Sequence, residues 1–277
     1  IIPPSIFMIL YSALTNTSVG SLFLAGVVPG LLLGVAYMIL NAMYAYKHHL
    51  PASEKWAGWS VLLRSLLFAL PALVAPFIIV AGIVFGKVTP TESGALTAAY
   101  VAVYGLLSRS LTLPKLLSAV IETARLSSAI FLIIAASATV SWLLSYVQAP
   151  AQFGELIAPF IHSPTTVLLL ISLITFVTGM FMEEVSALTL LTPVLWPVAI
   201  QAGVDPVHLG LVITFNITIA LITPPMGACV YVAAAVSKLD ILDLFKTIWP
   251  FVLVAVLVLL LVIFFPVLVL WLPQMLA

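Results

Sequence analysis

The chain has 277 residues, of which 64% are hydrophobic and 6% are charged, and its formal net charge is zero. Soluble domains carry about 25% charged residues, so this composition excludes a water-soluble fold and indicates a polytopic membrane protein. The neutral balance argues against a face that binds nucleic acid. The single cysteine, Cys229, excludes an internal disulfide and a site built from several cysteines.

A double proline lies at the start of the chain, within the segment Ile2-Pro3-Pro4-Ser5. Proline removes a backbone donor and clashes with the preceding helical turn, so we predict a helix break here and a half-helix over 5–14. Neither an initiating Met nor a signal-peptide pattern precedes this break. We therefore expect the sequence to be truncated at its N-terminus, without an upstream half.

Four later stretches are apolar and long enough to span a bilayer. They are 19–46, 65–86, 93–107 and 127–147. Residues 113–126 differ, because apolar side chains alternate at helical spacing with Lys115, Glu122 and Arg125. This pattern predicts a helix that lies in the membrane interface.

Lysine and arginine are concentrated in three loop regions. The segments 47–64, 109–125 and 238–246 hold eight of the nine, whereas the loop 148–164 holds none. The positive-inside rule places the first three segments in the cytoplasm. A final span is expected over 247–272.

The segment 165–200 has two interpretations. It could form two full spans joined in the cytoplasm, or a re-entrant hairpin that turns near Gly179 and returns to the outside. We favour the hairpin, because its return arm carries Pro193 and Pro197 and its turn carries Glu183-Glu184 rather than Lys or Arg.

A second double proline, in Thr223-Pro224-Pro225, predicts that a helix over 207–236 is broken. Each pair is followed 25 residues later by another proline, Pro29 or Pro250. Broken backbone survives in lipid only when it is buried in protein or lines a polar cavity. Two matching breaks therefore indicate the binding site of a secondary transporter built from repeats.

The chemistry of such a break suits a cation and an anion together. Carbonyl oxygens left by the prolines, with the Thr223 hydroxyl, suit a hard monovalent cation such as Na⁺. The N-termini of half-helices suit an anionic substrate. Asn216, inside an apolar run, either makes an interhelical hydrogen bond or acts near the cation or substrate.

The carboxylates allow more than one interpretation. If the hairpin lies at membrane depth, at most one of Glu183 and Glu184 points into a cavity, because adjacent helical residues do not share a face. The alternative is a solvated cytoplasmic turn. Glu92 follows Thr89-Pro90-Thr91 and is expected to lie in the capped, acidic first turn of the next helix.

Several ordered motifs resemble one family, the large membrane subunit of TRAP transporters (tripartite ATP-independent periplasmic, the DctM-like permease). They are Ile-Ile-Pro-Pro-Ser at 1–5, Leu-Phe-Leu-Ala-Gly-Val-Val-Pro-Gly at 22–30, Thr-Pro-Thr-Glu at 89–92, Gly-Met-Phe-Met-Glu at 179–183, and the run from Asp205-Pro206 to Met226-Gly227. The resemblance covers essentially the whole chain.

The resemblance implies a fold and a function. The fold is the inverted-repeat, elevator-type fold of the ion-transporter superfamily, with 1–46 ending the first repeat, 47–64 as a cytoplasmic connection and 65–277 forming the second repeat. The function is sodium-driven import of an organic acid, such as a C4-dicarboxylate or a sialic acid, across the bacterial inner membrane. The implied partners are a periplasmic binding protein (DctP-like) and a small membrane subunit (DctQ-like), within the lipid bilayer. Sodium is the coupling ion, and no other cofactor is implied.

The resemblance also implies site residues. One sodium site would use Gly179, Ala220, Thr223 and Met226, mostly through carbonyls, where the family commonly has Gly at the position of Ala220. Another would use Ile2 and Pro4. The residues expected to line the substrate cavity are Ser5, Glu183, Asn216, Pro224 and Pro225.

Two other classes compete with a transporter. An intramembrane enzyme could use Glu183 or Glu184 with a histidine, but neither a His-Glu-x-x-His nor a Gly-x-Ser-x-Gly motif is present. A passive channel would not need paired breaks that face a hairpin. We therefore expect a transporter and not an enzyme.

Overall fold

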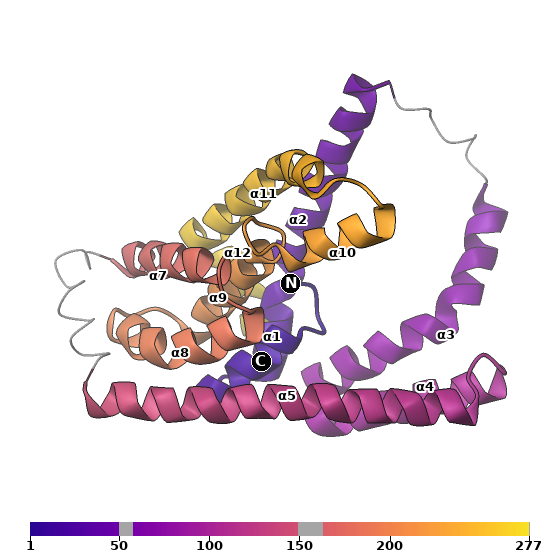
Figure 1. Ribbon diagram of the computed structural model, residues 1–277, viewed down its shortest axis with the longest axis horizontal. Helices are drawn as coiled ribbons and strands as arrows, with labels where there is room; N and C mark the ends of the chain where they lie inside the picture. The colour runs from indigo at the N-terminus through magenta and orange to yellow at the C-terminus, as the bar shows by residue number, and fades with distance from the viewer. Residues whose placement is uncertain (50–57, 149–162, 277) are drawn as a thin grey trace. The chain divides into compact units, whose positions relative to one another are not determined.

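The computed structural model describes residues 1–49, 58–148 and 163–276. Its helices are α1 (Ile6–Thr15), α2 (Val19–Lys47), α3 (Trp59–Val84), α4 (Pro90–Leu107), α5 (Leu113–Tyr146), α7 (Pro164–Gly179), α8 (Glu184–Gln201), α9 (Pro206–Ala220), α10 (Ala228–Ser237), α11 (Ile241–Phe264) and α12 (Val267–Leu276) (Figure 1). Five of the described helices, α2, α3, α5, α8 and α11, are long and apolar enough to cross a membrane. The predicted all-α polytopic membrane class is confirmed.

The chain forms two compact units, and each is described by itself. Unit 1 comprises Ile1–Tyr37 and Ser127–Ala277, and unit 2 comprises Met38–Leu126. This division follows packing and does not test the expected repeat boundaries at 46 and 65, which stay predictions. Much of the predicted connection 47–64 and of the predicted loop 148–164 lies outside the described residues.

Helix α9 is the centre of unit 1. It contacts α1, α7, α8, α11 and α12, and Figure 1 shows it among these helices. From His208 to Ala220 every residue of α9 except Thr218 is buried. A helix that is apolar on all sides has no solvent face, so α9 forms the core on which the other helices of this unit pack.

The start of α9 is capped by Asp205 and packs closely against α1 at Gly210. Asp205 is the N-cap, and its Oδ1 accepts hydrogen bonds from the backbone N–H groups of Val207 (2.8 Å) and His208 (3.1 Å). The hydroxyl of Tyr11 in α1 donates to the carbonyl of Pro206 (2.8 Å). A Cβ on Gly210 would collide with the Tyr11 ring, so only glycine lets α1 pack this closely.

In unit 2, α3 and α4 pack on each other through a capped turn. Thr89 and Glu92 form a capping box, in which Glu92 Oε2 accepts from the Thr89 N–H (2.7 Å) and the Glu92 N–H donates to Thr89 Oγ1 (3.3 Å). The predicted role of Glu92 at the start of a helix is confirmed. Tyr100 then joins the two helices by donating to the carbonyl of Pro71 (2.7 Å).

Two predicted elements differ in the structure. The single span expected over 247–272 is wrong, because α11 ends at Phe264 and α12 begins after Pro266. Residues 113–146 form one continuous helix, α5, where an interfacial helix and a span were expected. The placement of 113–126 in the interface stays a prediction.

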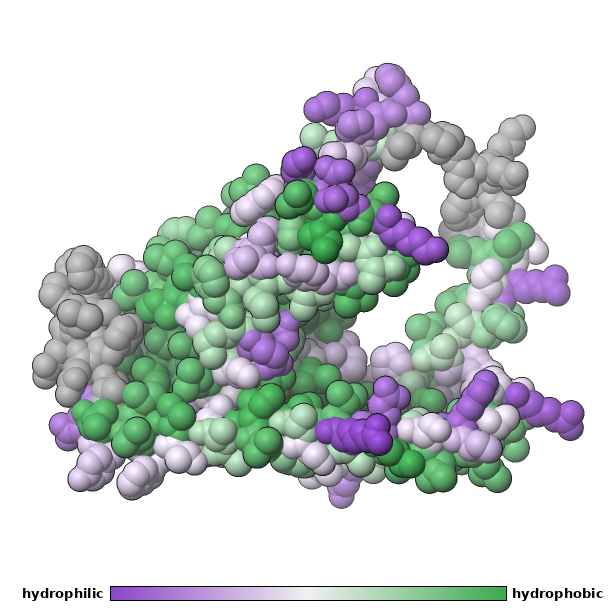
Figure 2. All heavy atoms as spheres, viewed as in Figure 1, coloured by the Kyte–Doolittle hydropathy of each residue, from purple (hydrophilic) through white to green (hydrophobic). Residues whose placement is uncertain are grey.

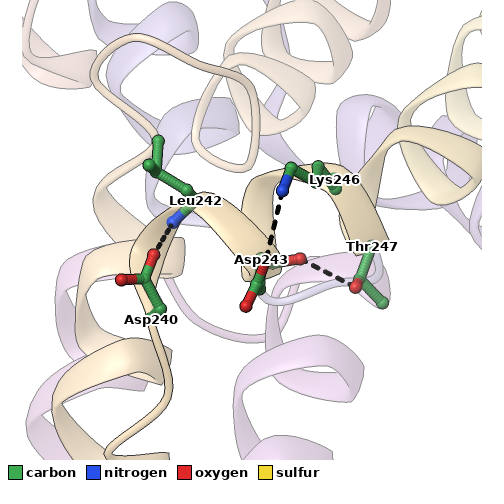
Figure 3. A network of polar contacts seen from close by, with 5 residues as sticks. All are labelled: Asp240, Leu242, Asp243, Lys246 and Thr247. Atoms are coloured by element: carbon green, nitrogen blue, oxygen red, sulfur yellow. Dashed lines mark hydrogen bonds and ion pairs between the residues drawn. The ribbon is translucent and has the colours of Figure 1, made fainter.

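The surface of unit 1 that Figure 2 shows is largely hydrophobic, and hydrophilic residues gather at the corner between α10 and α11. In this corner Asp240 caps α11 by accepting from the Leu242 N–H (2.7 Å), and the exposed pair Lys246–Asp243 lies 3.2 Å apart (Figure 3). An exposed ion pair of this kind adds little stability, so the cap is the main local signal that starts α11.

Candidate functional site

The predicted break at the second double proline is present between α9 and α10. Helix α9 ends at Ala220, and α10 begins at Ala228 after a loop that contains Pro224 and Pro225. Neither proline has an N–H group, so the helix cannot continue through them. Gly227 then adopts a left-handed conformation (φ +42°), which lets the chain re-enter a helix without a side-chain cap.

The carbonyls at the end of α9 are hydrogen-bonded within the break. The carbonyl of Ile219 accepts from the Ile222 N–H (3.1 Å) and from the Thr223 hydroxyl (2.7 Å). The carbonyl of Ala220 accepts from the Thr223 N–H (3.0 Å), and that of Leu221 from the Cys229 N–H (3.1 Å). These carbonyls are therefore not left without partners, but Ala220 and Leu221 each keep a second lone pair.

Thr223 is the polar side chain at the centre of the break. It is fully buried, and its hydroxyl donates its proton to the carbonyl of Ile219. A hydroxyl whose proton is used in this way can act toward another group only as an acceptor. Its oxygen therefore has the polarity that a cation requires.

The turn between α7 and α8 meets the break. A Cβ on Gly179 would lie 2.9 Å from the Cβ of Ala220, and the Met226 N–H donates to the carbonyl of Met180 (3.2 Å). The structure thus brings together the sequence-predicted residues Gly179, Ala220, Thr223 and Met226. Whether these residues hold sodium stays a prediction.

The carboxylate of Glu183 caps α8. Its Oε1 accepts from the Val185 N–H (3.1 Å), and its Oε2 accepts from the N–H and the hydroxyl of Ser186 (both 2.8 Å). Glu183 is exposed in the described chain and Glu184 is half-buried. The local role of Glu183 is therefore that of an N-cap, and its expected place in the substrate cavity stays a prediction.

Asn216 is fully buried and joins α9 to α7. Its Nδ2 donates to the Ser172 hydroxyl (3.0 Å) and to the carbonyl of Val212 (2.9 Å). It also lines, with Ser172, an otherwise apolar cavity of about 350 Å³ between α7, α9 and α11. Of the two interpretations of Asn216, the structure shows the interhelical hydrogen bond. A role near the cation or the substrate stays a prediction.

The residues of the predicted first break, which precede α1, lie against α2. A Cβ on Gly30 would be 2.6 Å from Cγ1 of Ile2, and one on Gly26 would be 2.6 Å from the carbonyl oxygen of Ile1. Pro4 is exposed, and Ser5 precedes α1 without capping it through its side chain. Ile2 therefore contacts α2. Helix α1, which follows these residues, packs against α8 and α9.

Aromatic residues support the other side of the second break. Gly227 lies under the Phe245 ring, since a Cβ there would be 2.9 Å from Phe245 Cε1. Tyr231 packs edge-on against the same ring with centroids 6.0 Å apart. Phe245 lies near the start of α11, which Asp240 caps, so this cap helps to hold α10 in place.

Sequence reasoning missed one contact of α9. Nε2 of His208 lies 2.9 Å from the carbonyl oxygen of Val262 in α11. The residue four positions after Val262 is Pro266, which has no N–H to offer this carbonyl. His208, which is buried, therefore supplies the missing donor through Nε2–H. The signal was Pro266, but nothing in the sequence linked it to His208.

Among the described residues, no group of three or more His, Cys, Asp or Glu side chains could hold a metal ion. A cation bound by this part of the chain would depend on carbonyl and hydroxyl oxygens. Such ligands suit hard cations rather than zinc or copper.

The chain matches a family of transport proteins. Residues 1–268 match the model of the DctM component of the tripartite ATP-independent periplasmic transporters. The chain belongs to this family, and it is a multi-pass protein of the inner membrane. Because this is a permease family and not an enzyme family, the alternative of an intramembrane enzyme is not supported.

Three relatives illustrate the match. The C4-dicarboxylate TRAP transporter large permease protein DctM of Pseudomonas aeruginosa is 34% identical over 277 residues. The sialic acid TRAP transporter large permease protein SiaM of Vibrio cholerae is 34% identical over 276 residues, and the ectoine permease protein TeaC of Halomonas elongata is 35% identical over 276 residues. Each alignment covers 99% of this chain and 64% of the relative, so the chain spans less than two-thirds of their length.

Proposed function

We propose that the chain is part of the large membrane subunit of a sodium-coupled secondary transporter that imports an organic acid. C4-dicarboxylates and sialic acids are the expected solutes. A periplasmic binding protein delivers the solute, and a small membrane subunit completes the membrane complex. The main support is that the α7–α8 turn contacts the α9–α10 break. Gly179 lies against Ala220, and the Met226 N–H donates to the carbonyl of Met180.

The chemistry of the break favours sodium as the coupling ion. The Thr223 oxygen is an acceptor, and the carbonyls of Ala220 and Leu221 each retain a lone pair. Together these atoms can neutralise part of a monovalent charge without a buried carboxylate. The first break, with Ile2 and Pro4, is the proposed place of a second sodium ion.

The helix starts favour an anionic solute. Neither α1 nor α10, the helices that follow the two double prolines, has a side-chain cap, whereas α4, α7, α8, α9 and α11 each have one. At α10 the N–H groups of Cys229 and Val230 bond to the carbonyls of Leu221 and Gly227, so what both helix starts offer is the partial positive charge of the helix dipole, which stabilises a carboxylate. The proposed lining of the substrate cavity is Ser5, Glu183, Asn216, Pro224 and Pro225.

Uptake into proteoliposomes tests the proposal. The whole gene product would be reconstituted with its small subunit and its binding protein, and supplied with labelled succinate or N-acetylneuraminate. We expect uptake of one of these solutes that requires an inward sodium gradient and the binding protein. Uptake that persists when choline replaces sodium, or that needs no binding protein, would contradict the proposal.

A further inference from the structure

Two buried polar atoms on α8 have no hydrogen-bond partner. They are Oγ1 of Thr192 and Nε1 of Trp196, and they are the only such side-chain atoms among the described residues. Thr192 is fully buried. Because the two residues are four positions apart on one helix, their side chains share a face. Buried polar atoms without partners are rare in folded proteins, and each one calls for an explanation.

Thr192 differs from the other buried threonines of these helices. The hydroxyls of Thr175, Thr189 and Thr214 each donate to the carbonyl four residues earlier, at 2.8 Å. Such a bond satisfies a hydroxyl inside a helix without any outside group. Thr192 does not make it, so its hydroxyl remains available to a group that is not part of the described protein.

The surrounding backbone of α8 is also polar. Pro193 and Pro197 lack the N–H groups that would bond to the carbonyls of Thr189 and Pro193. Prolines inside membrane helices are tolerated when side chains, ordered water or other groups satisfy the freed backbone. This stretch of α8 therefore combines two free side-chain donors with carbonyls that have lost their helical partners.

The donors define the ligand. Trp196 Nε1 can only donate, and the Thr192 hydroxyl can donate or accept, so the group that both residues can bind must be an acceptor. We propose that Thr192 and Trp196 form a two-donor site on α8 for one oxygen acceptor. The acceptor is a carboxylate oxygen of the solute or a resident water molecule. The first source rests on the function proposed above, and the second does not.

The variants Thr192→Val and Trp196→Phe test the site, because each removes a donor. Thr192→Val keeps nearly the same shape, whereas Trp196→Phe also makes the side chain smaller and lowers stability through lost packing. Thr189→Val is the matched control for a threonine whose hydroxyl already has partners, Val185 and Ser137. Trp249→Phe is the control for a tryptophan that is 45% exposed. Thr192→Ser restores the hydroxyl and should behave as the wild type.

Thermal unfolding of the whole gene product without solute tests whether the bound acceptor is a resident water molecule. If water is bound, Thr192→Val and Trp196→Phe each lower the unfolding temperature. The unfolding temperature of the double variant then falls by less than the sum of the decreases in the two single variants, because both donors share one ligand. If the solute is the ligand, the unfolding temperature of Thr192→Val without solute is unchanged or higher than that of the wild type, because an unsatisfied donor has been removed. Trp196→Phe then lowers the unfolding temperature only through lost packing.

Uptake and thermal unfolding with solute present test whether the acceptor is a carboxylate oxygen of the solute. With succinate or N-acetylneuraminate as the probe, loss of a donor to a carboxylate raises the apparent KM for uptake about tenfold or more and reduces the thermal shift that the solute causes at a given concentration. The sodium dependence of uptake stays as in the wild type. Failure of wild-type protein to take up any of these solutes would count against the proposed function, while the unfolding measurements without solute would still test the site.

Two results would overturn the site. One is a Thr192→Val variant that is as stable as the wild type, or more stable, while both variants keep the wild-type KM and thermal shift with solute. The other is an additive loss of stability in the double variant with no change in KM, since that pattern reports packing rather than a shared ligand.

Discussion

Gly179, the last residue of α7, faces Ala220, the last residue of α9, so closely that a methyl group on Gly179 would lie 2.9 Å from the methyl group of Ala220. Real Cβ atoms do not approach a neighbour at that distance. The absence of one side chain therefore sets how near the α7–α8 turn comes to the broken helix. The same closeness allows the Met226 N–H to reach the carbonyl of Met180.

Gly179→Ala is expected to separate the turn from the break. Overpacking of this kind costs about 1–3 kcal/mol, which exceeds the gain in helix propensity of about 1 kcal/mol. Thermal unfolding should show a less stable protein, and sodium-driven uptake should fall. Adding Ala220→Gly should restore both, because it removes the methyl group that collides.

The control for Gly179→Ala is Gly34→Ala in α2. Nothing lies within 4 Å of a Cβ added at Gly34. This change should leave stability unchanged or slightly higher. A Gly179→Ala protein that is as stable and as active as the Gly34→Ala protein would show that the approach of the two helices is not needed.

Thr223→Ala should weaken the response to sodium. The change removes the buried hydroxyl oxygen that we expect to bind the ion, so the sodium concentration for half-maximal uptake should rise about tenfold or more, as for loss of a bond to a charged group. Thr223→Ser keeps the oxygen and should remain close to the wild type.

The control for Thr223 is Thr218→Ala in α9, the helix that ends at the break. This change removes a hydroxyl that donates to the carbonyl of Thr214 (2.8 Å). It should leave the sodium dependence unchanged. An unchanged sodium dependence in Thr223→Ala would mean that the ion is bound elsewhere.

His208→Ala should destabilise unit 1. It leaves the buried carbonyl of Val262 without its donor, which costs about 1–3 kcal/mol. Pro266→Ala supplies the N–H that the helix lacks at that carbonyl, so His208→Ala should cost less in the Pro266→Ala background. Equal costs in the two backgrounds, measured by thermal unfolding, would show that the carbonyl is not what His208 stabilises.

The turn before α4 should be sensitive to acid. Hydrogen bonds from the Thr89 N–H and hydroxyl lower the pKa of the exposed Glu92 below its usual value of 4.5. Since the folded-state pKa is the lower one, the stabilisation is fully present above pH 4.5 and is lost as the pH falls through the lowered pKa.

Glu92→Gln tests this, because glutamine keeps the shape of the side chain without its charge. The unfolding temperature of the wild type should exceed that of Glu92→Gln near pH 7, and the difference should disappear at low pH. A difference that stays constant from pH 7 to pH 3 would show that ionised Glu92 does not stabilise the turn.

Much of the fold could be predicted from single stretches of sequence. The double prolines at 3–4 and 224–225 and the capping residues Thr89 and Glu92 act on their own backbone, so local chemistry is enough to place them. The division of 247–272 into α11 and α12 was missed because apolar composition reports affinity for lipid and not the continuity of a helix. Pro266, within that run, was the local signal.

The sequence by itself therefore determined that this is a membrane protein with one helix interrupted at Pro224-Pro225 and another that begins just after Pro3-Pro4, because composition and proline act residue by residue. Only the tertiary structure decided what the residues near these prolines contact. Gly179 lies against Ala220, Asn216 bonds to Ser172, and His208 reaches Val262, and these partners are 41, 44 and 54 residues apart. Contacts over such separations depend on how helices pack side by side, which no local pattern encodes.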